Sequence, residues 1–519
     1  MNVTTKVAPA PPDNALPTFT HKQILRVVTG IVLCILLAAI DQTVVVPAVP
    51  AIAADLNGFD HLSWIISAYL LTSTIATPIY GKLSDIYGRR MLLLSAIVIF
   101  LIASALCALS QSLLQLILFR ALQGLGGGGL MAISQAAIAD VVAPRERGRY
   151  QGYMAGTWGV ASVAGPILGG YLTDHVSWHA IFWINLPIGA IAFVLSNRAL
   201  KMLQTRRRAA NIDYLGAALL SAIITLCLLV MTWGGNAYAW TSPVILGLLV
   251  AACGFVALLV AQERRALDPM LPPRLFAHSV FSRGVIAASL AAGGLFGGTF
   301  LLPLYFQLVK GADAASSGTL IVPFLVINTV GAYCSGSLAR RLGRAKVLLL
   351  GGFGAATVGF ALLALMGEQT STLYAILSMM LVGFGIGFCM PACLVVVQNA
   401  AERRDVGSAT GALLFLRSMG AAFGSTLGGA LLTSRFADRL AQSGVHRHIY
   451  LGELRGAGGT LGNLDTATRA LAQHAVASGF HLAFGVIGGF TALALVICLG
   501  MRDLPLQSSG PSSSGAVGH

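Results

Sequence analysis

The sequence GKLSDIYGRR, residues Gly81–Arg90, lies between two long apolar runs. It is too short to form a domain, so we expect the two runs to be adjacent membrane helices. It is also basic, through Lys82, Arg89 and Arg90, and short basic loops favour the cytoplasmic side of a membrane. A weaker copy, GSLARRLGRAK, follows 255 residues later at 336–346. Two copies of one turn indicate a chain built from two related halves.

The composition indicates a membrane protein that crosses the bilayer many times. Of 519 residues, 56% are hydrophobic and 10% charged, with a mean hydropathy of +0.80. Soluble proteins carry about 25% charged residues. The net charge of +14 would suggest a nucleic-acid partner in a soluble domain, but here the basic residues fall in alternate short loops. We therefore expect the lipid bilayer, and no nucleic acid, around this chain.

No cofactor or metal site is expected. All eight cysteines fall inside apolar runs, which argues against a disulfide framework. Cys389 and Cys393 share a helix face, but no histidine or carboxylate accompanies them on that helix. The glycine-rich run GLGGGG at 124–129 lies inside an apolar helix and lacks the Lys-Ser/Thr ending of a phosphate loop.

Fourteen segments are long and apolar enough to be membrane helices, at about 20 residues each. The segments AIADVVAPRERGRYQG (137–152) and VQNAAERRDVGSATG (397–411) again relate the two halves. We expect an all-α membrane protein of two six-helix bundles with two inserted helices. The expected parts are a disordered cytoplasmic tail (1–22), a first bundle (23–200), a linker with the inserted pair (201–282), a second bundle (283–502) with an extracellular loop (434–479), and a second disordered cytoplasmic tail (503–519).

The charges of the loops predict the orientation. Loops of one parity hold 21 Lys and Arg residues, whereas the short loops of the other parity hold one, Lys310. Such an asymmetry places both termini in the cytoplasm and the protein in the cytoplasmic, or inner, membrane.

Two charged residues are expected deep in the membrane, at similar depth. Asp41 lies about 25 Å from the cytoplasmic end of its helix, and Arg120 about 12 Å from the outer end of another. Each would lower the energetic cost of burying the other. A carboxylate held in this way could bind a proton on one side and release it on the other, which makes the pair a candidate for proton coupling. The alternatives are a static ion pair or an exposed site in a miscounted helix.

The opening turn predicts a cytoplasmic gate. Asp85 sits one helical turn before Arg89, so it could pair with that guanidinium and cap the N-terminus of the next helix. The pairing would hold the cytoplasmic ends of the bundles together, whereas the alternative is an ordinary basic turn. In the second copy, Arg340 takes the place of Asp85. The gate should therefore depend on Asp85 more than on any single residue of the second turn.

Two further features of the spans are open to two interpretations. The run from 152 to 170 is rich in glycine and contains a Gly-Pro pair, so it is either a moving interface or a tightly packed helix. Arg417 is a third charged residue within a span and has no acid of its own nearby. It is either a structural residue that reaches the cytoplasmic surface or a functional one.

Together these residues resemble the major facilitator superfamily, in its fourteen-helix drug:proton antiporter branch. The resemblance covers about residues 24–501. Two departures are Pro47, where the family often has Asn, and His179, where Arg is usual. The similar motifs are IDQTVVVPAVP (40–50), GKLSDIYGRR (81–90), RALQGLGGG (120–128), GVASVAGPILGG (159–170) and SWHAIFWINLPIG (177–189).

The resemblance implies proton-driven export by alternating access. Asp41 and Arg120 would then be coupling residues. The cytoplasmic gate would comprise Gly81, Asp85, Gly88, Arg89 and Arg90, and the hinge of the fifth helix Gly156, Gly165, Pro166, Gly169 and Gly170. Candidate substrate contacts near the midplane are Trp64, Tyr69, Tyr305, Phe306, Gln307 and Asn328.

The expected substrates are amphipathic, often cationic, small molecules such as drugs and toxic compounds. The alternative is the export of one endogenous metabolite, such as a siderophore or an antibiotic. A sensor or scaffold on the same fold is a third interpretation, which Asp41 and Arg120 argue against, and no constellation of residues suggests an enzyme. Protons and a small molecule are the expected partners. In a Gram-negative host, a periplasmic adaptor protein would be a further candidate partner.

Overall fold

The computed structural model describes residues 20–56, 63–201, 213–234, 238–312, 314–442 and 466–503. Within these ranges the chain forms long helices and no named strand. Most of both predicted tails, and the middle of the predicted loop 434–479, lie outside the described residues. The helices are α1 His21–Asp55, α2 Ser63–Tyr87, α3 Arg89–Ala108, α4 Leu113–Val141, α5 Pro144–His175, α6 Ala180–Trp183, α7 Asn185–Leu200, α8 Tyr214–Trp233, α9 Pro243–Glu263, α10 Pro273–Ala277, α11 Ser279–Leu308, α12 Ala314–Leu320, α13 Val322–Leu342, α14 Ala345–Ala364, α15 Thr372–Ala400, η2 Arg403–Asp405, α16 Val406–Gln442 and α17 Thr466–Leu499.

The helix count agrees with the fourteen spans expected from the sequence. Twelve segments of the described residues are long and apolar enough to cross a membrane, with α6 and α7 forming one of them and α12 and α13 most of another. The other two spans are α2 and α5, which have 25 and 32 residues but carry more polar groups. A span needs about 20 residues, so both are long enough.

The helices form two bundles with the same internal contacts. In the first bundle α1 packs on α5 and α7, and α4 packs on α2 and α3. In the second bundle α11 packs on α16 and α17, and α15 packs on α13 and α14. The bundles contact each other through the pairs α2–α16 and α5–α13. These are equivalent pairs with the bundles exchanged, as expected for a chain of two repeats.

The inserted helices α8 and α9 pack against each other beside this interface. α8 contacts α2 of the first bundle and α16 of the second. Phe415 of α16 is buried in a cluster with Leu220, Ile223 and Ile224 of α8. The inserted pair therefore covers the α2–α16 seam, and no helix of the described residues covers the α5–α13 seam in the same way.

Prolines explain two interruptions of the spans. α7 begins at Asn185, two residues before Pro187, and α13 begins at Val322, directly before Pro323. Proline has no amide hydrogen and its ring clashes with the preceding turn, so each proline is tolerated in the first turn of a new helix.

The predicted loop 434–479 is shorter than expected, because α16 extends to Gln442 and α17 begins at Thr466. A helix can continue into water beyond the bilayer, and hydropathy does not report its end there.

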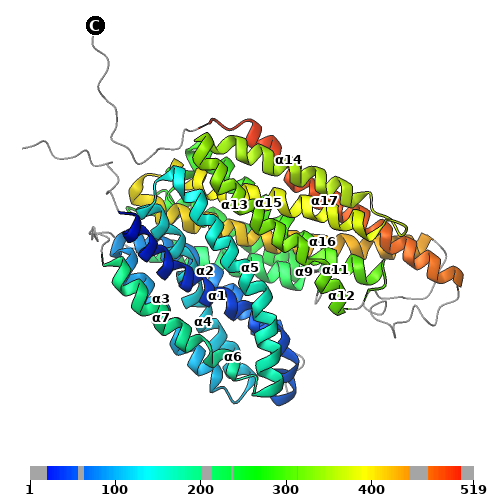
Figure 1. Cartoon of the computed structure of the whole chain (residues 1–519), viewed down its shortest axis with the longest axis horizontal. Helices are drawn as coiled ribbons and strands as arrows, with labels where there is room; N and C mark the ends of the chain where they lie inside the picture. Colours follow the sequence, from blue (N-terminus) through cyan, green and yellow to red (C-terminus); the bar gives the residue numbers. More distant parts are fainter. Residues whose placement is uncertain are drawn as a thin grey trace, which may run out of the picture.

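The bundles touch at one end of the molecule, which we call the closed end, and diverge towards the other, the open end (Figure 1). At the closed end the backbone of Gly81 in α2 meets that of Gly407 in α16, and Gly148 in α5 meets Gly336 in α13. Helix α1 begins and α17 ends at this same end (Figure 1). A chain with an even number of membrane spans begins and ends on the same side, which is consistent with the positions of α1 and α17.

Beyond the closed end, the facing helices expose apolar side chains. Val163 and Ile167 continue the face of α5 that touches α13, and both are exposed. Val326 continues the corresponding face of α13 and is also exposed. The two bundles are thus separated over the parts of α5 and α13 that lie towards the open end.

Candidate functional site

Asp41 and Arg120 form a buried ion pair between α1 and α4. The Nη1 atom of Arg120 lies 2.6 Å from Oδ2 of Asp41, and both side chains are almost completely buried. The guanidinium lies over the Tyr69 ring, with Cζ 4.4 Å from the ring centroid, an arrangement that stabilises a cation. The Arg120 Nε–H also donates to the carbonyl of Ile65 at 3.3 Å. The two charges therefore compensate each other inside the first bundle.

Three neutral side chains complete this site, and sequence analysis did not identify them. The amides of Gln123 and Asn185 each donate to Oδ1 of Asp41 at 2.8 Å. Both amides also donate to Ser104 Oγ, at 2.6 and 3.2 Å. The signal was present in the motifs already quoted, since Gln123 follows Arg120 by one helical turn in RALQG and Asn185 lies in WINLP. Such a network orients the carboxylate from three helices besides its own.

Asp85 connects the two bundles at the closed end. Its carboxylate lies 2.6 Å from Nη2 of Arg89 and accepts hydrogen bonds from the backbone amides of Gly407 and Ser408, at 2.9 and 2.8 Å. Those amides belong to the first turn of α16. A carboxylate there compensates unpaired N–H groups and the positive end of the helix dipole. The helix that Asp85 caps is therefore α16 of the second bundle and not α3, the next helix in the chain.

The remaining residues of the predicted gate have separate positions. Gly88 has φ of 91° between α2 and α3, a conformation that favours glycine. Arg89 also pairs with Asp140 of α4, through a 2.8 Å contact with Nε. Arg90 donates to Oδ1 of Asn197 in α7, at 2.6 Å from Nη2. Arg90 thus contributes to packing within the first bundle and not to the contact between bundles.

The second turn contributes a close backbone contact in place of an acid. A Cβ atom added at Gly336 would lie 2.1 Å from the carbonyl oxygen of Gly148. One layer further from the closed end, Gln398 of α15 donates to the carbonyl of Gln135 in α4 at 3.3 Å and to Thr410 Oγ1 at 3.1 Å. The closed end is therefore held by unlike contacts on its two sides.

The five residues of the predicted hinge in α5 face three directions. Gly156 faces α13 of the other bundle, whereas Gly165 and Gly169 pack closely on α1 within their own bundle. Gly170 has no atom near the position of a Cβ, and Pro166 lies inside the continuous helix α5. A hinge role for these residues stays a prediction.

Half of the predicted substrate contacts are buried in this conformation. Tyr305 and Phe306 belong to the core of the second bundle, where neither is exposed. Tyr69 is buried against Arg120. A substrate could reach these three residues only after a rearrangement.

The other three candidates are partly exposed. Trp64 lies at the start of α2. Gln307 donates to Ser317 Oγ at 2.8 Å, and Asn328 donates to the carbonyl of Gly383 at 3.1 Å. The polar groups of Gln307 and Asn328 therefore already make contacts within the second bundle.

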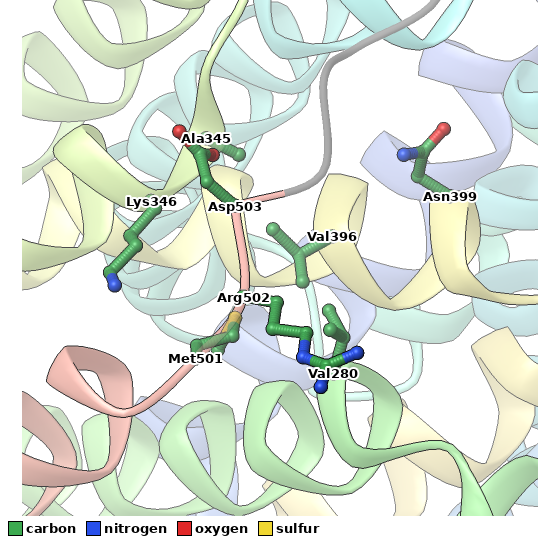
Figure 2. Close-up of a pocket in the computed structure, with 8 residues that line it drawn as sticks. All are labelled: Val280, Ala345, Lys346, Val396, Asn399, Met501, Arg502 and Asp503. Carbon is green, nitrogen blue, oxygen red and sulfur yellow. The ribbon is translucent and has the colours of Figure 1, made fainter.

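Two cavities between described residues are alternative sites, and neither has the size of a drug-binding pocket. Figure 2 shows the smaller cavity, with Val396 and Arg502 at its centre and Lys346 and Asn399 on either side. Its volume is about 10 Å³, room for little more than one water molecule. The larger, an apolar groove of about 250 Å³, is below the range of about 300–1,000 Å³ typical of ligand pockets. The groove is lined by Cys227, Met231, Ser289, Leu290, Met419, Gly420, Phe423 and Phe490.

The repeated helix bundles and the turn at Asp85 agree with sequence comparison. A family model described as Major Facilitator Superfamily matches residues 31–425. The chain belongs to the major facilitator superfamily. It is therefore a multi-pass membrane transporter of that superfamily, as the motifs suggested.

Relatives of this superfamily member include named drug transporters. Multidrug resistance protein 3 of Bacillus subtilis is 35% identical over 432 residues, which cover 82% of this chain and 83% of the relative. An uncharacterized transporter of Mycobacterium tuberculosis is 35% identical over 478 residues, 92% of this chain and 69% of the relative. The human organic anion transporter MFSD10 has the same fold, with a TM-score of 0.61 at 17% identity over 92% of this chain and 99% of that one.

Proposed function

We propose that this transporter is a proton-coupled antiporter that exports amphipathic small molecules across the cytoplasmic membrane by alternating access. The observation that carries the proposal is the buried pair of Asp41 and Arg120, 2.6 Å apart. Ionisable residues inside a membrane protein are costly and usually mark a path for protons or substrate. Similarity to Multidrug resistance protein 3 supports drugs and related compounds as substrates.

The neutral side chains around Asp41 suit a group that gains and loses a proton. Both amides donate to the carboxylate in this structure, and Asn185 Oδ1 is buried and accepts no hydrogen bond among the described residues. An amide that rotates about its last bond exchanges donor for acceptor. Asn185 could therefore accept a hydrogen bond from the protonated acid as readily as it donates to the carboxylate.

A hydrogen bond connects α1, the helix that carries Asp41, to α5 at the interface between the bundles. Thr43 lies two residues after Asp41 in α1, and its hydroxyl donates to the carbonyl of Ala161 in α5 at 2.9 Å. α5 is also the helix that touches α13 of the second bundle. A change in α1 on protonation would thus act directly on a helix whose contacts differ between open and closed states.

The distribution of arginine in the loops supports the closed end as the cytoplasmic end. In that orientation the structure corresponds to an outward-open state, in which the contacts of Asp85 close the cytoplasmic side. Export would require these contacts to break so that a substrate can enter from the cytoplasm.

Transport by inside-out vesicles with an acidic interior tests the proposal. The parent protein should accumulate ethidium, and accumulation should stop when the proton gradient is dissipated. Asp41→Asn should reduce accumulation to the level without a gradient. Asp174→Asn, a change at an exposed position near the end of α5, is the matched control and should behave as the parent. Equal gradient-driven accumulation by Asp41→Asn and the parent would contradict proton coupling through Asp41.

A further inference from the structure

Arg417 lies about a third of the way along the 37-residue helix α16. α16 begins at Val406, so Arg417 is about 16 Å from the start of the helix at 1.5 Å per residue. The hydrocarbon core of a bilayer is about 30 Å thick. An arginine side chain cannot span the roughly 16 Å from Arg417 to the start of the helix. If the closed end is cytoplasmic, as proposed, Arg417 therefore does not reach the cytoplasmic end of its helix.

The helical register places Arg417 on the side of α16 that faces the interior of the molecule. Phe415 packs on the opposite side, in a cluster with the inserted helix α8. Two turns earlier, on the face of Arg417, Thr410 accepts a hydrogen bond from Gln398 of α15. The same face contacts α11 one and two turns later, where Gly420 meets Ser289 and Gly424 meets Gly293. Arg417 is thus directed towards α15 and α11, away from lipid.

This guanidinium has no counter-charge in the described part of the chain. Arg417 makes neither a hydrogen bond nor an ion pair with any described residue. Arg417 is half-buried. The other deep arginine, Arg120, is in contrast fully compensated by Asp41.

We propose that Arg417 binds the acidic group of an amphipathic organic anion, such as an aromatic carboxylate, during transport. The inference rests on the proposed export function and names a substrate class for it. An unpaired arginine is costly inside a membrane protein, and a carboxylate forms charge-assisted, often bidentate, hydrogen bonds with a guanidinium. No described side chain supplies that charge, so a ligand is the partner that would.

The position of Arg417 also determines how an anion would reach it. The layer of Gln398, which bridges to Gln135 in the first bundle, lies between Arg417 and the closed end. In this conformation an anion would therefore approach from the open end. A bound anion would lower the cost of burying Arg417 when the bundles close over it. Binding would thus favour a conformation in which the two bundles meet around the anion on the open side, as expected for a transported molecule.

Binding of a matched pair of probes to the full-length protein in lipid nanodiscs tests the proposal. The pair is 2-naphthoate and 2-naphthamide, which share a ring system and differ in charge. The parent should bind the acid at least about tenfold more tightly than the amide, since a charge-assisted hydrogen bond contributes about 1.5–3 kcal/mol. Arg417→Gln should abolish this difference, and Arg417→Lys should retain most of it. Arg264→Gln, at an exposed arginine that ends α9, is the matched control.

Thermal unfolding separates binding from a structural role. Arg417→Gln removes an uncompensated charge, so it should unfold at the same or a higher temperature than the parent, whereas loss of a structural contact would lower that temperature. The acid should raise the unfolding temperature of the parent and not that of Arg417→Gln. Equal affinities of acid and amide for the parent, undetectable binding of the acid, or unchanged acid affinity in Arg417→Gln would each overturn the proposal. Binding needs no proton gradient, so these binding results can be interpreted even if the transport experiment with ethidium fails.

Discussion

The carboxylate of Asp85 accepts a hydrogen bond from the backbone amide of Gly407 at 2.9 Å, although 322 positions separate the two residues. The same carboxylate pairs with Arg89 one turn away, at 2.6 Å. One side chain therefore joins the end of α2 to the first turn of α16. This contact requires the two bundles to meet at the closed end, so it stabilises the conformation described here.

Asp85→Asn should shift the transporter away from the conformation described here. The change removes the negative charge that compensates the start of α16, and hydrogen bonds to a charged group contribute about 1.5–3 kcal/mol. A shift of roughly tenfold in the population of the two states is expected. Spin labels at the exposed Met91 of α3 and Leu342 of α13 should report longer distances, in a background with the exposed Cys253 replaced by serine.

The control for this variant is Asp140→Asn. Asp140 contacts the same guanidinium of Arg89 at 2.8 Å but belongs to α4 of the first bundle. Its loss removes an ion pair without removing the cap of α16, so its distance distribution should remain close to that of the parent. Equal distributions for both variants would show that the contact with α16 does not hold the closed end.

Gly336→Ala should loosen the other side of the closed end. The added Cβ would lie 2.1 Å from the carbonyl oxygen of Gly148, so the backbones of α5 and α13 must move apart. The spin-label pair of the preceding experiment should again report longer distances. Gly354→Ala in α14 is the control, because no atom lies within 4 Å of its added Cβ. An unchanged distribution in Gly336→Ala would mean that the contact is not needed for closure.

The sequence singles out Asp85 but does not predict the contacts that Asp85 makes. Asp85 was expected to act more strongly than any single residue of the second turn, on the basis of the acid that this turn lacks. The close contact at Gly336 acts through backbone distance instead of charge, and the sequence of the turn shows only a glycine. The bond from Asp85 to Gly407 depends on how two bundles meet. No local periodicity reports such a contact.

The buried site was predicted in part for similar reasons. Asp41 and Arg120 stand out because charged residues are rare in apolar spans, and counting along the helices predicts similar depths. Ser104 and Asn185 are neutral, and such residues occur in spans for many reasons. Their contribution depends on the packing of α7 on α1 and of α3 on α4 and α7. Hydropathy finds each helix but not which of its faces meets Asp41.

Asp41→Asn should destabilise the protein more than the double variant Asp41→Asn/Arg120→Gln. Removing one partner of a buried pair leaves the other charge uncompensated, at a cost of about 3–5 kcal/mol. Removing both leaves two neutral groups among amides that can hydrogen-bond to them. Thermal unfolding in detergent should therefore place the double variant between the single variant and the parent. A double variant less stable than Asp41→Asn would contradict a compensating role for the pair.

Thr43→Val tests whether α1 acts on α5 through the hydroxyl of Thr43. Valine has nearly the shape of threonine, so packing against Gly165 is retained while the 2.9 Å hydrogen bond to the carbonyl of Ala161 is lost. If protonation of Asp41 is transmitted along this route, gradient-driven accumulation of ethidium in inside-out vesicles should fall severalfold, with little change in the unfolding temperature. Thr29→Val is the control, since the hydroxyl of Thr29 bonds only within α1, to the carbonyl of Leu25. Parent-like transport by Thr43→Val would mean that the coupling between Asp41 and the interface of the bundles takes another path.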